Sequence, residues 1–241
     1  MRKSRIILFL LAGIMLIAGV VIFFLPEYRT SVQNAEESQT IQSFQEYVKE
    51  QPEKQPDFLL PSYMEPAIPF PELREACEDY NYTLYENEQE LLSEESVTLP
   101  ALRLSDYGYE QEVFGYISIP AVEMESPLYL GASSANLNQG AAILGQTSLP
   151  IGGENTHCVI AGHRSWNGAI KFRGIEDLSP GDTVYITNLW ETLTYTVVNV
   201  QIILPDEIEK IIIQPGRDLL SIFTCTYPNT RRVLVTCERA T

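Results

Sequence analysis

Hydrophobic residues follow three different patterns along the chain. Twenty consecutive residues, Ile6 to Leu25, carry no charged side chain, and a helix of that length at about 1.5 Å per residue can cross a hydrocarbon core of about 30 Å. Between Pro71 and Leu92, apolar residues recur at intervals of three, four and seven, which predicts helix with one docking face. From Phe114 onward, short β-branched and aromatic runs are broken by turn residues, a pattern typical of an all-β barrel or sandwich.

The apolar run has the features of a membrane anchor. It is preceded by three cations, Arg2, Lys3 and Arg5, so the positive-inside rule predicts a cytoplasmic N-terminus and an extracytoplasmic remainder. A cleavable signal peptide is the alternative, but its apolar region spans about 7–15 residues and ends at small residues. Pro26-Glu27-Tyr28 is not such a site. We therefore expect residues 1–26 to form a cytoplasmic tip and an uncleaved, single-pass transmembrane anchor.

Two segments separate this anchor from the β-rich region. Residues 27–71 are rich in Gln, Glu, Ser and Pro and are expected to form an extracytoplasmic stalk, with at most a short helix around Ile41–Val48. Residues 72–112 form an acidic, partly helical extension. This extension either docks on the domain that follows, as a lid, or remains a solvated helix.

The β-rich domain spans residues 113–241. It is expected to contain eight strands: Phe114–Ile119, Ser126–Leu130, Ala141–Leu144, His157–Gly162, Thr183–Thr187, Leu193–Leu204, Leu219–Thr224 and Arg232–Glu238. Turns at 149–154 and 179–182 contain the Gly and Pro residues that turn geometry requires, and short helical turns are expected after Ser133 and near 167–178. The run from Leu193 is longer than most strands and is expected to bend or to serve two neighbours.

Composition excludes some classes of function. The chain has 241 residues, enough for one sizeable domain with appendages, and its net charge is 16 − 32 = −16. Nucleic-acid binding is not expected, because phosphate contacts require clustered cations. Four Cys and two His without paired short spacings do not form a zinc cage, and we expect neither metal nor cofactor.

Two predicted strands end in reactive residues. The strand from His157 delivers His163, and the strand from Leu219 delivers Cys225. A turn over 227–232 then sends the chain back, which sets Arg232 close to Cys225. A thiol, an imidazole and a guanidinium could thus converge in one cleft.

These three groups suit acyl transfer. A thiolate attacks a carbonyl carbon, a His donates a proton to the departing amine, and an Arg stabilises an oxyanion or holds the substrate. Spacing alone leaves open a purely structural role for His163. His157 begins its strand and is interpreted as a packing or surface residue. The other thiols are interpreted as small buried hydrophobes: Cys77, Cys158 and Cys237.

Two runs, 149–164 and 219–235, resemble the sortases, which are membrane-anchored cysteine transpeptidases of Gram-positive bacteria. Ser221–Cys225 is a weakened form of the family's Thr-X-Thr-Cys signature, and the resemblance covers about residues 110–239. It implies an eight-stranded β-barrel with Cys225 as nucleophile, His163 as general acid/base and Arg232 as the oxyanion-binding or substrate-positioning group. Arg231 is the alternative for the arginine role, although strand alternation lets one of the two face the cleft.

The resemblance is strongest to the class C, pilin-polymerising sortases. Phe114–Pro120, Gly162–Arg164 and Thr224–Tyr227 are of that type, and Tyr80–Leu84 is similar to the segment before their lid. Their lids usually carry an Asp-Pro-aromatic motif, whereas Tyr85-Glu-Asn-Glu follows here. If a lid exists, we expect it to act through Tyr85 or the tyrosines at 107 and 109.

The resemblance implies a two-step reaction on proteins that bear a Leu-Pro-X-Thr-Gly-like sorting signal. Cys225 would form a thioester, and an amine from a pilin Lys or a cell-wall cross-bridge would accept the acyl group. Two alternatives remain open. One is an extracytoplasmic cysteine peptidase that transfers the acyl group to water. The other is a non-enzymatic, surface-binding β domain in which Cys225 is buried and unreactive.

Overall fold

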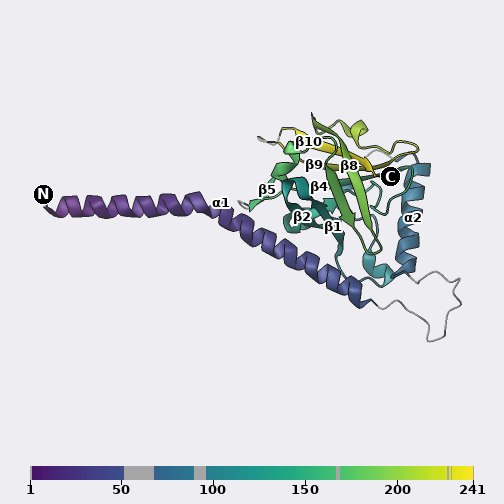
Figure 1. Ribbon diagram of the computed structural model, residues 1–241, viewed down its shortest axis with the longest axis horizontal. Coiled ribbons are helices and arrows are strands. Elements are labelled where there is room, and N and C mark those ends of the chain that lie inside the picture. The colour runs from purple at the N-terminus through teal and green to yellow at the C-terminus, as the bar shows by residue number, and fades with distance from the viewer. Residues whose placement is uncertain are drawn as a thin grey trace.

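A β-barrel with one long helix projecting from it forms the body of the protein (Figure 1). We describe it from a computed structural model, in which the described residues are 2–51, 68–89, 96–166, 169–226, 228 and 230–240. The N-terminus lies at the far end of the projecting helix, and the C-terminus lies on the barrel.

The barrel is closed by eight strands in the order β1-β2-β3-β4-β9-β10-β8-β7. Their bounds are β1 Val113–Ile119, β2 Met124–Leu130, β3 Ala141–Ile143, β4 Thr156–Ala161, β7 Thr183–Thr187, β8 Thr192–Ile203, β9 Asp218–Cys225 and β10 Arg232–Arg239. The pairs β2–β3 and β4–β9 are parallel, and the other pairs are antiparallel. The predicted eight-stranded barrel is therefore confirmed, while the two-residue strands β5 Ser165–Trp166 and β6 Ala169–Ile170 were not predicted.

Strand β8 serves two neighbours, as its length predicted. Its 12 residues pair with β7 over Thr192–Thr196 and with β10 over Tyr195–Ile203. The register shifts opposite Thr236/Cys237, because a long strand that closes a barrel must bend.

Both faces of the β4–β9–β10 sheet carry apolar residues. On one face, Ile160, Ile222 and Val235 belong to the main core inside the barrel. On the other face, Val159 and Leu234 belong to a second cluster outside it. Side chains alternate between the two faces along each strand. The outer cluster therefore buries part of the external surface of the barrel.

Helix α1 runs from Arg2 to Glu50 without interruption. Among the described residues it is the one helix long and apolar enough to cross a membrane, and its Phe9 and Phe23 side chains are 75% and 76% exposed. Figure 1 shows that α1 bends before it reaches the barrel. Pro26 lies inside the helix, where it lacks an amide hydrogen and disfavours straight helix.

Residues 27–50 continue α1, so the helix allowed around Ile41–Val48 is present but is much longer than the stalk expectation gave it. Ile41 and Phe44 are buried against the barrel, and Phe44 packs edge-on against Tyr116 of β1. Contacts with the barrel therefore stabilise a segment whose composition alone did not predict a stable helix. The rest of the expected stalk, residues 52–67, lies outside the described residues.

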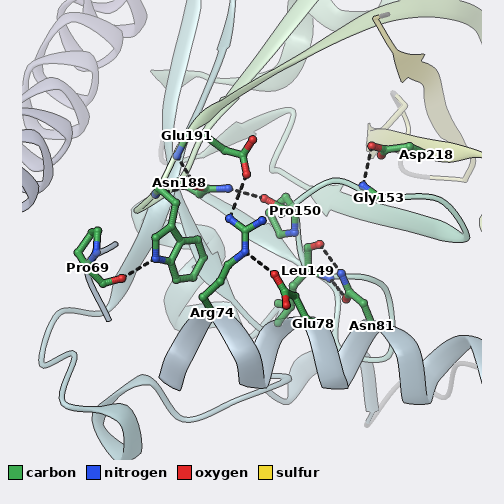
Figure 2. Close-up of polar contacts among 11 residues, drawn as sticks. Pro69, Arg74, Glu78, Asn81, Leu149, Pro150, Gly153, Asn188, Glu191 and Asp218 are labelled. Carbon is green, nitrogen blue, oxygen red and sulfur yellow. Dashed lines mark hydrogen bonds and ion pairs between the residues drawn. The ribbon is translucent and has the colours of Figure 1, made fainter. Parts of the chain in front are cut away.

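Helix α2, Pro71–Glu86, confirms the predicted docking face. Proline occupies the first turn, and the buried residues are Leu73, Cys77 and Asn81. Asn81 both donates to and accepts from the backbone of Leu149, at 3.0 and 2.7 Å, as Figure 2 shows. The helix ends at Glu86 rather than at Leu92, and residues 90–95 lie outside the described residues.

Helix α2 lies near the start of β9 rather than near its end. Arg74 pairs with Glu191 at 3.0 Å, in the turn between β7 and β8 (Figure 2). Figure 2 also shows Gly153, whose amide donates to Asp218 at the first residue of β9 at 3.0 Å. Since β9 runs from Asp218 to Cys225, α2 docks at the end of the barrel opposite Cys225.

Two short helices lie where turns were predicted. Helix α3 spans Ser134–Gln139, and the Ser133 hydroxyl caps it by accepting from the Asn136 amide at 3.2 Å. A short 3₁₀ helix, η4, spans Phe172–Asp177 after β6.

Candidate active site

Cys225 and Arg232 lie directly opposite each other on neighbouring strands. Cys225 is the last residue of β9, Arg232 is the first residue of β10, and the antiparallel register pairs them. The Thr226 amide donates to the Arg231 carbonyl at 3.0 Å and closes the hairpin. Directly opposed residues have Cβ atoms about 4.5–5.5 Å apart on one face of the sheet, so the thiol and the guanidinium share a face, as predicted.

His163 reaches the same end of the sheet from the other side of β9. The parallel β4–β9 register ends with Ala161 opposite Phe223. Beyond it, the Gly162 amide donates to the Phe223 carbonyl at 3.2 Å, and the Thr224 hydroxyl donates to the Gly162 carbonyl at 2.7 Å. These bonds carry the register forward and bring His163 level with Cys225. The structure thus brings together the three elements that the sequence analysis singled out.

A pocket of about 260 Å³ begins beside this end of the sheet. Phe223 and Leu234, which share the outer face with Cys225 and Arg232, form its floor together with Arg232 itself. The segment between β8 and β9 supplies a wall through Ile208 and Ile211. The pocket is mainly apolar, and its lining includes one cationic and one anionic side chain, Arg232 and Glu207.

Comparison with known proteins identifies the family. A model described as "Sortase domain" matches residues 117–240, which is 124 of the 241 residues. The chain belongs to the sortase family. Sortase A of Streptococcus agalactiae serotype III is 30% identical over 130 residues, 52% of each chain. This sortase spans between 52% and 66% of the length of the three curated relatives that it matches.

Solved structures give a longer match. Clostridium perfringens sortase C with the C-terminal cell wall sorting motif is 30% identical, with a TM-score of 0.66 over 85% of this sortase and 99% of that chain. A lid mutant of Streptococcus agalactiae sortase C1 is 27% identical, with a TM-score of 0.63 over 71% of this sortase and 89% of that chain. The sequence relatives are called sortase A and these structural neighbours sortase C.

Cys225 differs from the other three thiols of this sortase. All four cysteines are free, but Cys225 alone among them is half-buried while the rest are buried. Burial raises the pKa of Cys77 and of Cys237 to about 12 and raises that of Cys158 as well. The prediction that these three are packing residues is confirmed by their burial.

His163 is half-buried, and its surroundings disfavour the imidazolium form. Burial lowers the pKa of His163, and the nearby positive charge of Lys171 lowers it further. Lys171 precedes η4, and no feature of the sequence pointed to it. A lowered pKa leaves a larger neutral fraction of the imidazole at neutral pH.

Arg231 and His157 lie away from this arrangement. Arg231 is exposed in the hairpin loop before β10, so the register favours Arg232 as the residue that faces Cys225. His157 is fully buried, with Nε2 at 2.8 Å from the Ser221 hydroxyl and Nδ1 at 2.8 Å from the Ile212 carbonyl. Of its two interpretations, packing residue or surface residue, burial confirms the first.

The extension contacts the pocket through a residue that the sequence did not indicate. Tyr109 is fully buried against Tyr47 and Phe70, away from the pocket, and Tyr85 lies near Ile212 beside a different cavity. Instead Val97 lines the pocket. Its carbonyl accepts from the amides of Ala132 and Gly145 at 2.9 and 3.1 Å.

Among the described residues, no group of three or more His, Cys, Asp or Glu side chains is arranged to hold a metal ion.

Proposed function

We propose that the protein is a transpeptidase that cleaves a Leu-Pro-X-Thr-Gly-like sorting signal and transfers the acyl group to an amine. The observation that carries the proposal is the strand register, in which Cys225 and Arg232 are paired. His163 follows the strand that runs parallel to β9, and Arg232 lines an apolar pocket. A nucleophile, a proton carrier and a fixed cation at one site are the groups that acyl transfer through a thioester requires.

The first step forms the thioester. The Cys225 thiolate attacks the carbonyl carbon of the signal's Thr, and the resulting tetrahedral oxyanion accepts hydrogen bonds from Arg232. His163, in the fraction of molecules in which it is protonated, donates its proton to the Gly nitrogen as the C–N bond breaks. The second step reverses the proton transfer: neutral His163 takes a proton from the incoming amine, which attacks the thioester and releases Cys225. Neither step requires a metal or a nucleotide.

The pocket beside Arg232 suits the apolar beginning of the signal. Its walls and floor are formed mainly by Ile208, Ile211, Phe223 and Leu234, and apolar contacts of this kind bury a Leu side chain favourably. One structural neighbour, the sortase C of Clostridium perfringens, was solved with the C-terminal cell wall sorting motif. That precedent supports a signal of the same general kind here.

We further propose a class C role, with a pilin Lys as the amine acceptor and a cell-wall cross-bridge amine as the alternative. Similarity to several sortase C structures over more than four fifths of the chain supports this assignment. The lid expected for that class would be formed by residues 72–112. Val97 is the part of that segment that lines the pocket, which supports a lid that acts through the stretch around Val97.

The site would lie outside the cell. We propose that α1 is an uncleaved anchor with its cationic tip in the cytoplasm, so that the barrel is extracytoplasmic. Sorting-signal proteins, pilins and cell-wall precursors are all available on that side of the membrane.

Replacement of the nucleophile tests the proposal. We expect Cys225→Ala to abolish acyl transfer from a Leu-Pro-X-Thr-Gly peptide to a Lys-containing acceptor, and to abolish the hydroxylamine-sensitive acyl-enzyme detected by mass spectrometry. Cys237→Ala, one strand away and buried, is the matched control and is expected to retain both. Transfer by Cys225→Ala at the wild-type rate would contradict the proposal. Cleavage unaffected by added amine would favour a peptidase, and a wild-type thiol inert to alkylation would favour a binding domain.

A further inference from the structure

The anchor helix is joined to the barrel by a buried ion pair. Lys171 Nζ lies 3.0 Å from Glu37 Oε1, and the two side chains are 4% and 8% exposed, the least exposed ion pair among the described residues. The Ser126 hydroxyl of β2 donates to the other carboxylate oxygen of Glu37 at 2.7 Å. Lys171 also donates to the Asn138 carbonyl at 3.1 Å. Both charged groups therefore have fixed partners on separate elements.

Lys171 and its neighbour support the segment that carries His163. The Lys171 amide donates to the Arg164 carbonyl, and the Phe172 amide donates to the His163 carbonyl, both at 3.1 Å. The Phe172 ring packs so closely on Gly162 that a Cβ atom there would overlap it. The backbone on both sides of His163 is thus held by residues 171 and 172.

We propose that the anchor helix supplies a positioning residue to the active site: Glu37 holds Lys171 in place and, through it, the segment that bears His163. Glu37 acts through Lys171 and is not itself a catalytic residue. The inference rests on the proposed function for the role of His163, but the contacts that carry it involve residues outside the pocket.

Burial explains why this pair can position the loop. A buried ammonium group is stable only when it is paired and hydrogen-bonded. If the Glu37 charge is lost, Lys171 must move toward water or remain uncompensated, and either result disturbs the bonds to His163 and Arg164. The same helix carries the apolar run, so the arrangement of this catalytic group depends on how the anchor helix docks.

The pair also sets the charge around His163. Lys171 before η4 is a charge that acts on His163, and the neighbouring elements also carry Cys225 of β9, Arg232 of β10 and Arg164 with its partner Glu176. From α1, Glu37 offsets the charge of Lys171. Removing either member of the pair therefore changes the protonation of His163, and the two changes have opposite signs.

The test uses the full chain in detergent micelles and follows the His163 ring by NMR titration. The chain has two histidines, and burial lowers the pKa of the other, His157, to about 4, so a His163→Gln variant assigns the signals. We expect Glu37→Gln to lower the pKa of His163 and Lys171→Gln to raise it. Both variants should reduce kcat for acyl transfer about 10-fold or more with little change in KM, as expected for a misplaced proton donor.

Glu36→Gln is the matched control. Glu36 is the neighbouring, exposed residue of the same helix, and this variant is expected to behave as wild type. The double variant Glu37→Gln/Lys171→Gln removes both charges of the pair and so leaves neither of them buried and unpaired. It is therefore expected to fold even if a single variant does not, and the inference can still be tested with it. We expect it to return the pKa of His163 toward the wild-type value while kcat stays low.

Three results would overturn the inference. The first is a Glu37→Gln variant with wild-type kcat and an unchanged His163 titration. The second is a pKa change of the same sign in both single variants, and the third is a double variant with full activity. If the titrations shift as expected but the wild-type protein transfers no acyl group, the proposed function fails and the positioning of His163 by Glu37 stands.

Discussion

Arg231 and Arg232 are adjacent in the chain but have different surroundings. Arg232 is half-buried, is paired in register with Cys225 and lines the pocket, whereas Arg231 is exposed in the hairpin loop. A guanidinium stabilises a developing oxyanion only if it lies within hydrogen-bond reach of that atom. The two arginines are therefore expected to have different roles, because the strand register pairs Arg232, and not its neighbour Arg231, with Cys225.

We expect Arg232→Ala to reduce kcat/KM for acyl transfer about 10²- to 10³-fold, the usual cost of a lost oxyanion donor. Arg231→Ala, the matched control, should remain within about threefold of wild type, because an exposed cation contributes little at this distance. Steady-state kinetics with a fluorescent signal peptide measures both. A larger loss in Arg231→Ala would assign the role to Arg231.

Buried His157 makes the stability of the fold dependent on pH. Burial lowers its pKa from 6.5 to about 4, so the unfolded chain binds its proton more readily than the folded one. The contribution of neutral, buried His157 to the free energy of unfolding is therefore fully present above about pH 6.5. It is lost as the pH falls toward about 4.

We expect the free energy of unfolding to fall by as much as about 3 kcal/mol over that range because of this residue. In His157→Gln the difference between stabilities at pH 7 and pH 4.5 should shrink by a similar amount. Urea unfolding of the barrel, followed by near-UV circular dichroism, measures it. His163→Gln, at a half-buried site, is the control and should change the dependence less. Equal pH dependence in wild type and His157→Gln would contradict the assignment.

At the scale of elements, residues 96–100 form a strap across the edge of the pocket. Two glycines allow its close approach. At Gly131, which has a φ of +82°, a Cβ would lie 2.7 Å from the Thr98 carbonyl oxygen, and at Gly145 a Cβ would overlap the carbonyl oxygens of Ser96 and Leu99. The strap is thus seated by backbone contacts that larger residues would prevent.

Gly145→Ala should displace the strap, because the obstructing atoms are backbone rather than flexible side-chain ends. We expect a loss of about 1–3 kcal/mol in the free energy of unfolding and faster alkylation of Cys225 if the strap restricts access to the site. Iodoacetamide kinetics and thermal unfolding measure these effects. In the control Gly174→Ala, the nearest atom is a Val122 side-chain carbon at 3.2 Å. An unchanged alkylation rate of Cys225 in a destabilised Gly145→Ala variant would show that the strap does not restrict access to the site and acts only as a spacer.

At the scale of the whole molecule, one continuous helix links the apolar N-terminal run to the barrel (Figure 1). The same helix holds Glu37, Ile41 and Phe44 against the barrel surface. The barrel is therefore not suspended on an extended chain at this point. If the apolar run lies in a bilayer, α1 limits the positions that the pocket can take above it.

Whole cells provide a test of the orientation. We expect a membrane-impermeant maleimide applied to intact cells to label the protein, because the proposed orientation puts the barrel outside and Cys225 is the half-buried thiol, whereas Cys77, Cys158 and Cys237 are buried. Cys225→Ala should remove the label, while permeabilised cells serve as a control for access. Labelling of wild type only after permeabilisation would place the barrel in the cytoplasm.

Local patterns determined much of the fold. The eight strands of the barrel were predicted within one or two residues at most ends, because period-two alternation and turn residues act over a few positions of chain. The order of Cys225, the tight turn and Arg232 likewise determined that these two residues meet, since a hairpin sets its own register. The apolar run was equally readable because a span requires an unbroken stretch of about 20 residues.

Tertiary structure alone decided what lies around that hairpin. The helix over 27–50, the docking of Glu37 on Lys171 and the approach of Val97 to the pocket join residues that are far apart in sequence. No periodicity encodes such contacts, because each is stabilised by burial against a surface that exists only after the barrel has closed. The sequence therefore specified the reactive groups, and the closed barrel determined which distant residues hold and cover them.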